Sequence, residues 1–172
     1  MSSEFICGGQ EYEVYYPTGT IGMLVPLDGL PLSVKVQEDT FYLPTPYHVS
    51  LFYTGRLIDK YNISIPDFKN KIIEDFCEFT KINEITLTGY KNEYRLAVCD
   101  DSMKTIIVMC EVSNLNKFFD LMNKKYKLKI KYPVPHITLY NTLKGKPGWY
   151  LLDSDDVEKY TTPINNPIGR EL

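Results

Sequence analysis

The sequence predicts an α+β fold in which two lobes, each an antiparallel sheet with a helix, face each other across a central cleft. Short β-rich segments bounded by turn residues alternate with two stretches of helical periodicity. A histidine-bearing strand precedes the first helix and another follows the second, so each half of the chain contributes one. A chain of 172 residues is too short for two independent enzymes, so residues 1–172 are expected to form a single bilobal domain.

The first half of the chain is expected to begin with two strands. Apolar runs occupy residues 20–27 and 47–53, and the turn pairs Asp28-Gly29 and Thr54-Gly55 close them. Residues 30–46 contain three prolines and some charge. That composition predicts a loop with a short edge piece between the two strands.

Two helices are predicted from apolar side chains at helical spacing. The first covers roughly residues 66–80, with Ser64 as its N-cap. The second covers residues 114–126, with Ser113 or Asn114 as its cap and lysines near its C-terminus, where cations are favourable. The apolar positions that define them are Phe68, Ile72, Ile73, Phe76 and Phe79, then Leu115, Phe118, Phe119 and Met122.

Further strands are expected between and after the helices. Residues 85–87, 95–99 and 105–110 are short β-rich segments separated by turns, which suggests antiparallel neighbours. Residues 134–140 form the last strand, entered through two prolines. The remainder is loop-rich with one short helical turn near residues 155–160, and the acidic residues 153–156 are expected to start that turn rather than to bind a cation.

Charge limits the partners that the chain can bind. The formal net charge of −3 and a pI near 5.4 argue against a basic surface that grips long nucleic acid along its phosphates. A small nucleotide or a short oligonucleotide needs only a local positive pocket. We therefore expect a small-nucleotide partner rather than a long nucleic acid.

The cysteines and the N-terminal residues together predict the cellular compartment of the protein. Cys7, Cys77, Cys99 and Cys110 are widely scattered without a Cys-x-x-Cys spacing, so they are expected to be reduced and mostly buried. The N-terminus lacks a basic start followed by a long apolar run, and no apolar stretch approaches the length of a membrane span. We expect a monomeric cytoplasmic protein that does not bind membranes.

The two histidines of the chain stand in matching four-residue patterns. One reads His48-Val49-Ser50-Leu51 and the other His136-Ile137-Thr138-Leu139. Because side chains alternate along a strand, each imidazole shares a face with the hydroxyl two residues further on, about 6 to 7 Å away. Two unrelated core histidines would match in this way on the order of one time in a thousand at average composition. The pattern therefore favours a functional pair.

Two imidazoles with two hydroxyls suit phosphodiester cleavage without a metal or other cofactor. One imidazole can take a proton from the attacking group while the other protonates the leaving oxygen. The hydroxyls of Ser50 and Thr138 can bind the non-bridging phosphate oxygens as charge develops. The sequence assigns neither histidine to the base or the acid role. Two histidines without nearby Cys or acidic partners fall short of a usual zinc site.

These motifs resemble those of a known family. Residues 48–55, His-Val-Ser-Leu-Phe-Tyr-Thr-Gly, are similar to the first His-x-Thr/Ser motif of the LigT-like 2H phosphoesterases, and residues 135–139, Pro-His-Ile-Thr-Leu, are similar to the second. The resemblance implies a bilobal 2H phosphoesterase-like fold with one motif in each lobe. Bacterial members acting on RNA ends often carry a basic residue where this chain has Asn141. That departure favours the family's small-nucleotide branches.

Five further residues are candidates for contact with the substrate. Lys144 and Lys146 could hold a phosphate and Trp149 could stack on a base, although the same loop could be solvated with Trp149 as a plug between lobes. Arg56 is a phosphate candidate, and a solvated strand-end arginine is its alternative. By alternation, Tyr140 shares the face of His136 and is expected in the pocket.

The sequence as a whole predicts a metal-independent phosphodiesterase that cleaves a small nucleotide by two-histidine catalysis. Its expected substrates are cyclic di- or oligonucleotides, 2′-5′ oligonucleotides or 2′,3′-cyclic phosphates, and degradation of a nucleotide immune signal is one role that would follow. Two alternatives remain open, an RNA-end processing 2H enzyme and a nucleotide-binding module without turnover.

Overall fold

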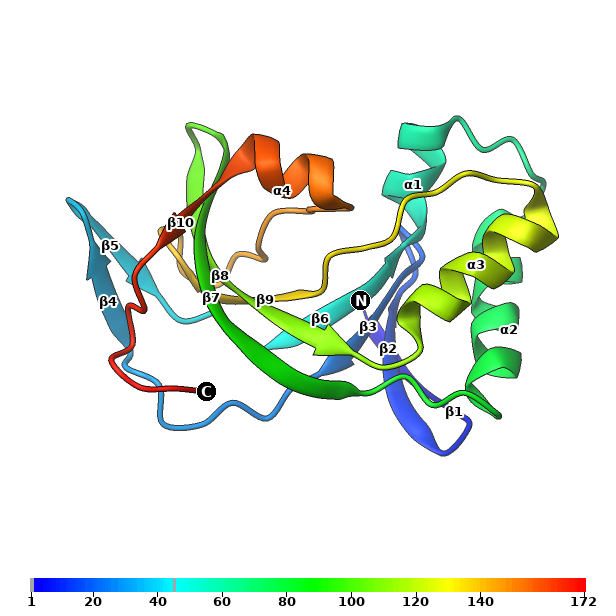
Figure 1. Cartoon of the computed structure of the whole chain (residues 1–172), viewed down its shortest axis with the longest axis horizontal. Coiled ribbons are helices and arrows are strands. Elements are labelled where there is room, and N and C mark those ends of the chain that lie inside the picture. The colour runs from blue at the N-terminus through cyan, green and yellow to red at the C-terminus, as the bar shows by residue number, and fades with distance from the viewer. Residues whose placement is uncertain (1, 45) are drawn as a thin grey trace. The chain divides into compact units, whose positions relative to one another are not determined.

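The computed structural model describes residues 2–44 and 46–172, which form an α+β fold of ten strands and four helices (Figure 1). The strand pairs whose registers are defined are all antiparallel. The chain divides into two compact units. Unit 1 comprises Met1–Met23, Ser50–Thr88 and Val112–Pro133, and unit 2 comprises Leu24–Val49, Gly89–Glu111 and Val134–Leu172.

Unit 1 begins with a meander of three antiparallel strands. β1 (Ser2–Cys7) pairs with β2 (Gln10–Tyr15), which pairs with β3 (Thr20–Leu24). Gly8 in the first turn has a φ of +59°, and a Cβ there would lie 2.3 Å from the carbonyl oxygen of Thr80. Only glycine fits a backbone this close in a left-handed conformation.

Three helices complete unit 1: α1 (Thr54–Tyr61), α2 (Phe68–Thr80) and α3 (Leu115–Tyr126). Their buried faces meet around aromatic rings. Phe76 contacts Tyr12 and Phe118 edge-on, with ring centroids 4.8 and 5.2 Å apart, and Phe52 lies 5.6 Å from Phe118. Edge-to-face pairs of this kind add about 0.5–1.5 kcal/mol each beyond the burial of their area.

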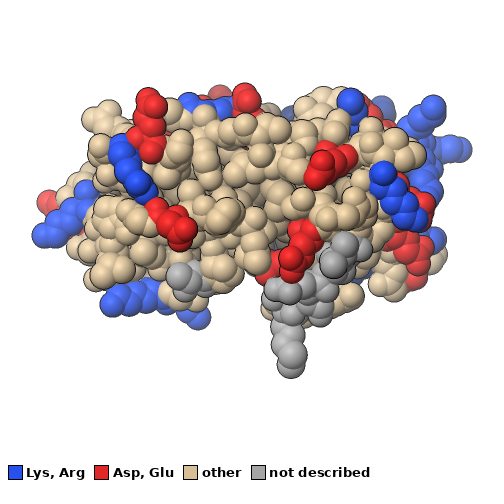
Figure 2. All heavy atoms as spheres, turned by 90° about the horizontal axis from the view of Figure 1, so that it is seen from below, with Lys and Arg blue, Asp and Glu red and all other residues tan. Residues whose placement is uncertain are grey.

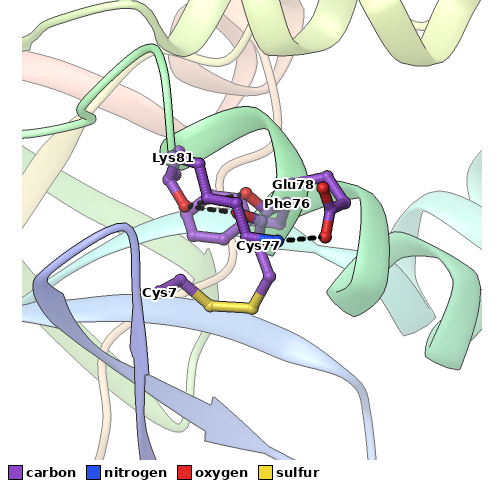
Figure 3. A network of polar contacts seen from close by, with 6 residues as sticks. Cys7, Phe76, Cys77, Glu78 and Lys81 are labelled. Carbon is purple, nitrogen blue, oxygen red and sulfur yellow. Dashed lines mark hydrogen bonds and ion pairs between the residues drawn. A yellow bond between two sulfur atoms is a disulfide. The ribbon is translucent and has the colours of Figure 1, made fainter.

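Cys7 and Cys77 form a disulfide that links the end of β1 to α2, beside the ion pair of Lys81 with Glu78 (Figure 3). The expectation that all four cysteines are reduced is therefore wrong. The two partners are 70 residues apart in sequence and 4.8 Å apart between their Cα atoms, a proximity that the fold creates and cysteine spacing does not reveal. Cys99 and Cys110 are free, and burial raises the pKa of their thiols to about 11 and about 12.

Unit 2 holds the strands that carry the histidines. The strand order is β6-β9-β8-β7-β10, and the β4–β5 hairpin adds to β9 through the pair Tyr42 and Asn141. The strands are β4 (Ser33–Val36), β5 (Asp39–Tyr42), β6 (His48–Tyr53), β7 (Leu87–Asp100), β8 (Met103–Val112), β9 (His136–Asn141) and β10 (Thr161–Ile164). The ends of β6, β7 and β8 extend into unit 1.

The core of unit 2 lies between β7, β8 and the helix α4 (Ser154–Tyr160). Ala97 on β7 and Ile107 and Met109 on β8 cluster with Leu151, and side chains of α4 pack against them. As predicted, a helix starts in the acidic stretch: α4 begins at Ser154 and has Asp155 and Asp156 in its first turn. Asp153 is its N-cap, and its carboxylate accepts hydrogen bonds from the backbone N–H groups of the helix's first turn.

Several elements differ from the sequence-based expectation. The hairpin of β1 and β2, the helix α1 and the strand β10 were not predicted, and residues 30–46 contain the β4–β5 hairpin rather than one short edge piece. The turn expected at residues 89–92, between two of the predicted strands, does not form: β7 runs through these residues, with Asn92 at a φ of +49°. α2 starts after Asp67 rather than Ser64.

A helix that crosses a membrane must be both long and apolar. None of the helices formed by residues 2–44 and 46–172 is long and apolar enough to cross a lipid bilayer.

Candidate functional site

The two strands that carry the histidine motifs, β6 and β9, are antiparallel neighbours. Val49 of β6 pairs with Ile137 of β9, and both are fully buried. Residues flanking such a pair also face each other, which sets His48 opposite Thr138. Cross-strand neighbours share a face of the sheet with Cβ atoms about 4.5–5.5 Å apart. The first imidazole therefore lies beside the hydroxyl of the second motif.

His48 and Thr138 line a pocket of about 200 Å³ in unit 2. The other lining residues are Pro44, Pro46, Gly145, Lys146, Pro147 and Gly148. Ligand pockets usually measure about 300–1,000 Å³, so this one fits a single phosphate with the sugar next to it rather than a whole dinucleotide. The prolines restrict the backbone that lines the pocket. The ionisable side chains in the pocket lining are those of Lys146 and His48.

His136 is buried, with 6% of its surface exposed, and does not line this pocket. Its Nδ1 lies 2.8 Å from the carbonyl oxygen of Val134. A carbonyl only accepts hydrogen bonds, so Nδ1 carries the proton and the neutral ring keeps a lone pair on Nε2. Burial lowers the pKa of His136, and the nearby His48 lowers it further, against the bond to Val134. At neutral pH this imidazole is a proton acceptor.

A β-bulge changes which side chains of β9 face the site. Ile107 of β8 pairs with Thr138, but the next pair along is Ile106 with Tyr140, so β9 contains one extra residue. Paired residues share a face and consecutive residues alternate, so the bulge turns Tyr140 away from the face of Thr138. Tyr140 is fully buried there, and its hydroxyl donates to the carbonyl of Pro31, 3.1 Å away. The structure does not bring Tyr140 to the pocket.

The same bulge turns Asn141 onto the face of the site. Asn141 pairs with Thr105, and Thr105 shares its face with Ile107 and hence with Thr138. In the sequence, Asn141 stands out only as a departure from the family pattern. Strand alternation would place Asn141 on the face of the site only if the extra residue of β9 were already known.

The loop after β9 lies over the second motif. Lys146 lines the pocket, whereas the ammonium of Lys144 lies over the ring of Tyr42, 4.7 Å from its centroid. Gly148 rests directly on Thr138, since a Cβ at this glycine would lie 2.0 Å from the threonine hydroxyl oxygen. The loop therefore covers part of the face that carries the hydroxyl.

The side chain of Trp149 packs against the core of unit 2. Its Nε1 donates to the carbonyl of Met103, 3.0 Å away, and its ring packs on the cluster around Ile107 and Leu151 within unit 2. This agrees with the alternative that the ring is a plug, although the plug fills the core of one unit. Base stacking by Trp149 has no support from its contacts.

Two predicted site residues belong to unit 1. Ser50 is half-buried on β6 and, by alternation, is on the same face of that strand as His48. Arg56 is exposed on α1. Both histidines belong to unit 2, so the expected division of one motif to each lobe is not seen, and the boundary falls within the first motif.

Metal ligands do not gather near these residues. In the part of the chain that the structure describes, residues 2–44 and 46–172, no group of three or more His, Cys, Asp or Glu side chains could hold a metal ion. The donors that surround the pocket are the imidazole, hydroxyl and ammonium already named.

Comparison of the chain with known protein families, with curated proteins and with solved structures finds no match. The functional argument consequently rests on the two motifs and on the geometry that surrounds them.

Proposed function

We propose that the chain is a metal-independent phosphodiesterase for small nucleotides, with a 2H phosphoesterase-like fold of which units 1 and 2 are the lobes. The observation that carries the proposal is the in-register pairing of β6 with β9. It sets His48 beside Thr138 in a pocket that Lys146 also lines. Two matching motifs that pair strand to strand are hard to explain as unrelated core histidines.

The tautomer of His136 gives the two imidazoles different roles. His136, neutral with a free Nε2 lone pair, takes the proton of the attacking hydroxyl or water. His48, half-buried in the pocket wall, protonates the departing oxygen. The two residues are diagonal neighbours across the strand pair, with a separation of about 7 to 8 Å. A phosphorus atom fits between them, with the attacking and leaving oxygens on opposite sides.

Donors to the phosphate complete the proposed mechanism. The Thr138 hydroxyl and the Lys146 ammonium face the same pocket and can bind the non-bridging oxygens, whose negative charge grows in the transition state. The motif alone suggests that the Ser50 hydroxyl also binds these oxygens. The pocket volume suits one phosphodiester with its neighbouring sugar, so the remainder of a larger nucleotide would lie outside it.

Incubation with a panel of nucleotides followed by mass spectrometry tests this proposal. The panel contains 2′,3′-cyclic monophosphates, 2′-5′ and 3′-5′ dinucleotides, and cyclic di- and oligonucleotides. Activity on at least one class should survive EDTA. His48→Asn and His136→Gln should each lower turnover by about 10²-fold or more, the usual contribution of a positioned acid or base. An exposed substitution, Asn165→Asp, serves as the control.

Two results would contradict the proposal. One is full activity in the double histidine variant, and the other is activity that metal chelation abolishes. Incorporation of labelled water oxygen into a linear product would identify water as the nucleophile, whereas a cyclic phosphate product would identify a ribose hydroxyl.

One observation favours a second candidate, a nucleotide-binding module without turnover. His136 is 94% buried and lies outside the lining of the pocket, as a structural histidine would. This candidate predicts that the ligand stays intact over hours at saturating protein. It also predicts that His136→Gln leaves the affinity for the ligand unchanged.

A further inference from the structure

The middle of the loop after β9 is attached to the sheet through one buried amide. Asn141 is 1% exposed, and its side chain lies between the strand and the loop. Its Nδ2 donates to the carbonyl oxygen of Lys146, and its Oδ1 accepts from the Thr105 hydroxyl, 2.8 Å away. Both ends of the amide are therefore used, and the side chain has one orientation that satisfies both partners.

We infer that Asn141 is a positioning residue that fixes the backbone of Lys146, and with it the cationic wall of the pocket. The inference rests on the proposed function, because it takes the pocket of His48, Thr138 and Lys146 as the place where phosphate binds. Asn141 does not line the pocket and acts through Lys146.

Within residues 2–44 and 46–172, further hydrogen bonds hold the two ends of the loop. At its start, the Thr142 N–H donates to the Lys104 carbonyl and the Lys104 N–H donates to the Thr142 hydroxyl, both at 3.0 Å. At its end, Trp149 is held by its bond to Met103. Residues 143–147 between them are exposed. The hydrogen bond from Asn141 to Lys146 therefore fixes the position of these exposed residues.

The position of Lys146 matters because positive charge is scarce in unit 2. This unit contains 8 Lys and Arg against 12 Asp and Glu, a net charge of −4. Of the nearby cations, Lys144 lies over the ring of Tyr42 and Lys104 is paired with Asp39. An anion entering the pocket meets Lys146, so displacement of its backbone weakens anion binding directly.

Asn141→Asp tests the inference with little change in volume. The carboxylate still accepts from Thr105 but can no longer donate to the Lys146 carbonyl, and the two oxygens repel each other. Inorganic phosphate is the probe, and its binding is followed by the NMR signals of the two imidazoles, which are the only histidines in the sequence. Phosphate should bind about tenfold more weakly, which corresponds to about 1.4 kcal/mol. Asn165→Asp, the same change at an exposed site of unit 2, should bind as the wild type does.

A double-variant cycle separates positioning from direct binding. Lys146→Met should weaken phosphate binding by a similar factor, and Asn141→Asp should add little to it, because both changes remove the same cation from the pocket. The single tryptophan adds a conformational readout. Trp149 ends the same loop, so its emission should change in Asn141→Asp and stay unchanged in Asn165→Asp.

The outcomes distinguish this inference from the proposed function. Phosphate binding could depend on Asn141 and Lys146 while no nucleotide is cleaved. That result would support the inference and refute the proposed phosphodiesterase activity. Wild-type phosphate affinity in folded Asn141→Asp, fully additive effects in the double variant, or no phosphate binding by the wild type would each overturn the inference. If Asn141→Asp does not fold, Thr105→Val provides the second test. It frees the acceptor end of the amide and should weaken phosphate binding several-fold.

Discussion

At the scale of single residues, His136 links function to stability. Its ring is buried and neutral, with a pKa lowered from the ordinary value of 6.5, chiefly by desolvation. The unfolded chain therefore binds a proton more readily than the folded chain does. The contribution of His136 to the free energy of unfolding is fully present above about pH 6.5 and is lost as the pH falls toward the lowered folded pKa.

We predict that the wild-type protein becomes less stable on acidification from pH 7.5 to pH 5.5, and that His136→Gln shows a weaker dependence over this range. Urea unfolding at several pH values measures both. His48→Asn is the matched control because it removes the half-buried histidine of the neighbouring strand. Identical pH profiles for the wild type and His136→Gln would contradict the assignment of His136 as a buried neutral base.

The proposed catalytic pair stands out at the level of single residues because its signal is local. His48 and His136 each precede a hydroxyl by two positions, and strand alternation alone puts each imidazole and hydroxyl on one face. The faces of Tyr140 and Asn141 were not predictable. They depend on an extra residue in β9 that is visible only in its pairing with β8.

At the scale of elements, α4 depends on its cap. Asp153 accepts from the N–H groups of Asp155 and Asp156, 3.1 and 3.3 Å away, and is 1% exposed. The helix is only seven residues long, so a capping side chain accounts for much of its stability. Side chains of α4 in turn pack on the core cluster of unit 2.

Asp153→Ala should lower the free energy of unfolding by about 0.5–2 kcal/mol, the usual cost of losing a capping oxygen. Asp153→Asn retains such an oxygen and should lose less. Chemical denaturation of the two variants beside the wild type measures the difference. Equal losses in both would show that the buried charge, and not the cap, stabilises this end of the helix.

The elements that the sequence predicted correctly are those with a long periodic pattern or a strong boundary. α2 and α3 repeat apolar residues over three turns, and α4 follows a run of capping residues. Some of the missed elements are short and pair with segments distant in sequence. β10 pairs with β7, which ends 61 positions before β10 begins, and the β4–β5 hairpin adds to β9 through a single residue pair. Local patterns contain no information on such partners.

At the scale of the whole molecule, charge is distributed unevenly between the units. Unit 1 contains 11 Lys and Arg against 10 Asp and Glu, a net charge of +1, whereas unit 2 has −4. On the face seen in Figure 2, Lys and Arg stand in small groups interspersed with Asp and Glu. No continuous basic stripe crosses the described part of that face.

The disulfide crosslinks two segments that are far apart in the sequence. A crosslink between residues 70 positions apart removes chain entropy worth about 4 kcal/mol from the unfolded state. The double variant Cys7→Ser, Cys77→Ser should therefore unfold with a free energy lower by about that amount in non-reducing buffer. A reductant should destabilise the wild type similarly and leave the double variant unchanged. Cys99→Ser, at a cysteine that is already free, is the control.

No effect of reductant on the wild type would show that this bond does not form in solution. Its presence also argues against the predicted cytoplasmic location, because disulfides persist mainly in oxidising compartments. Isolation of the protein under thiol-trapping conditions, followed by mass spectrometry, would report the oxidation state of Cys7 and Cys77 in the cell.

The same bond determines what a protease can release. A cut at any peptide bond between residues 8 and 76 opens the loop that the disulfide closes, but it leaves both fragments covalently joined. A cut after Cys77 frees the C-terminal fragment instead. Electrophoresis without reductant would thus show one band of full mass for the first kind of nick and two bands for the second. Migration alone would map the accessible segments of the chain to one side or the other of Cys77.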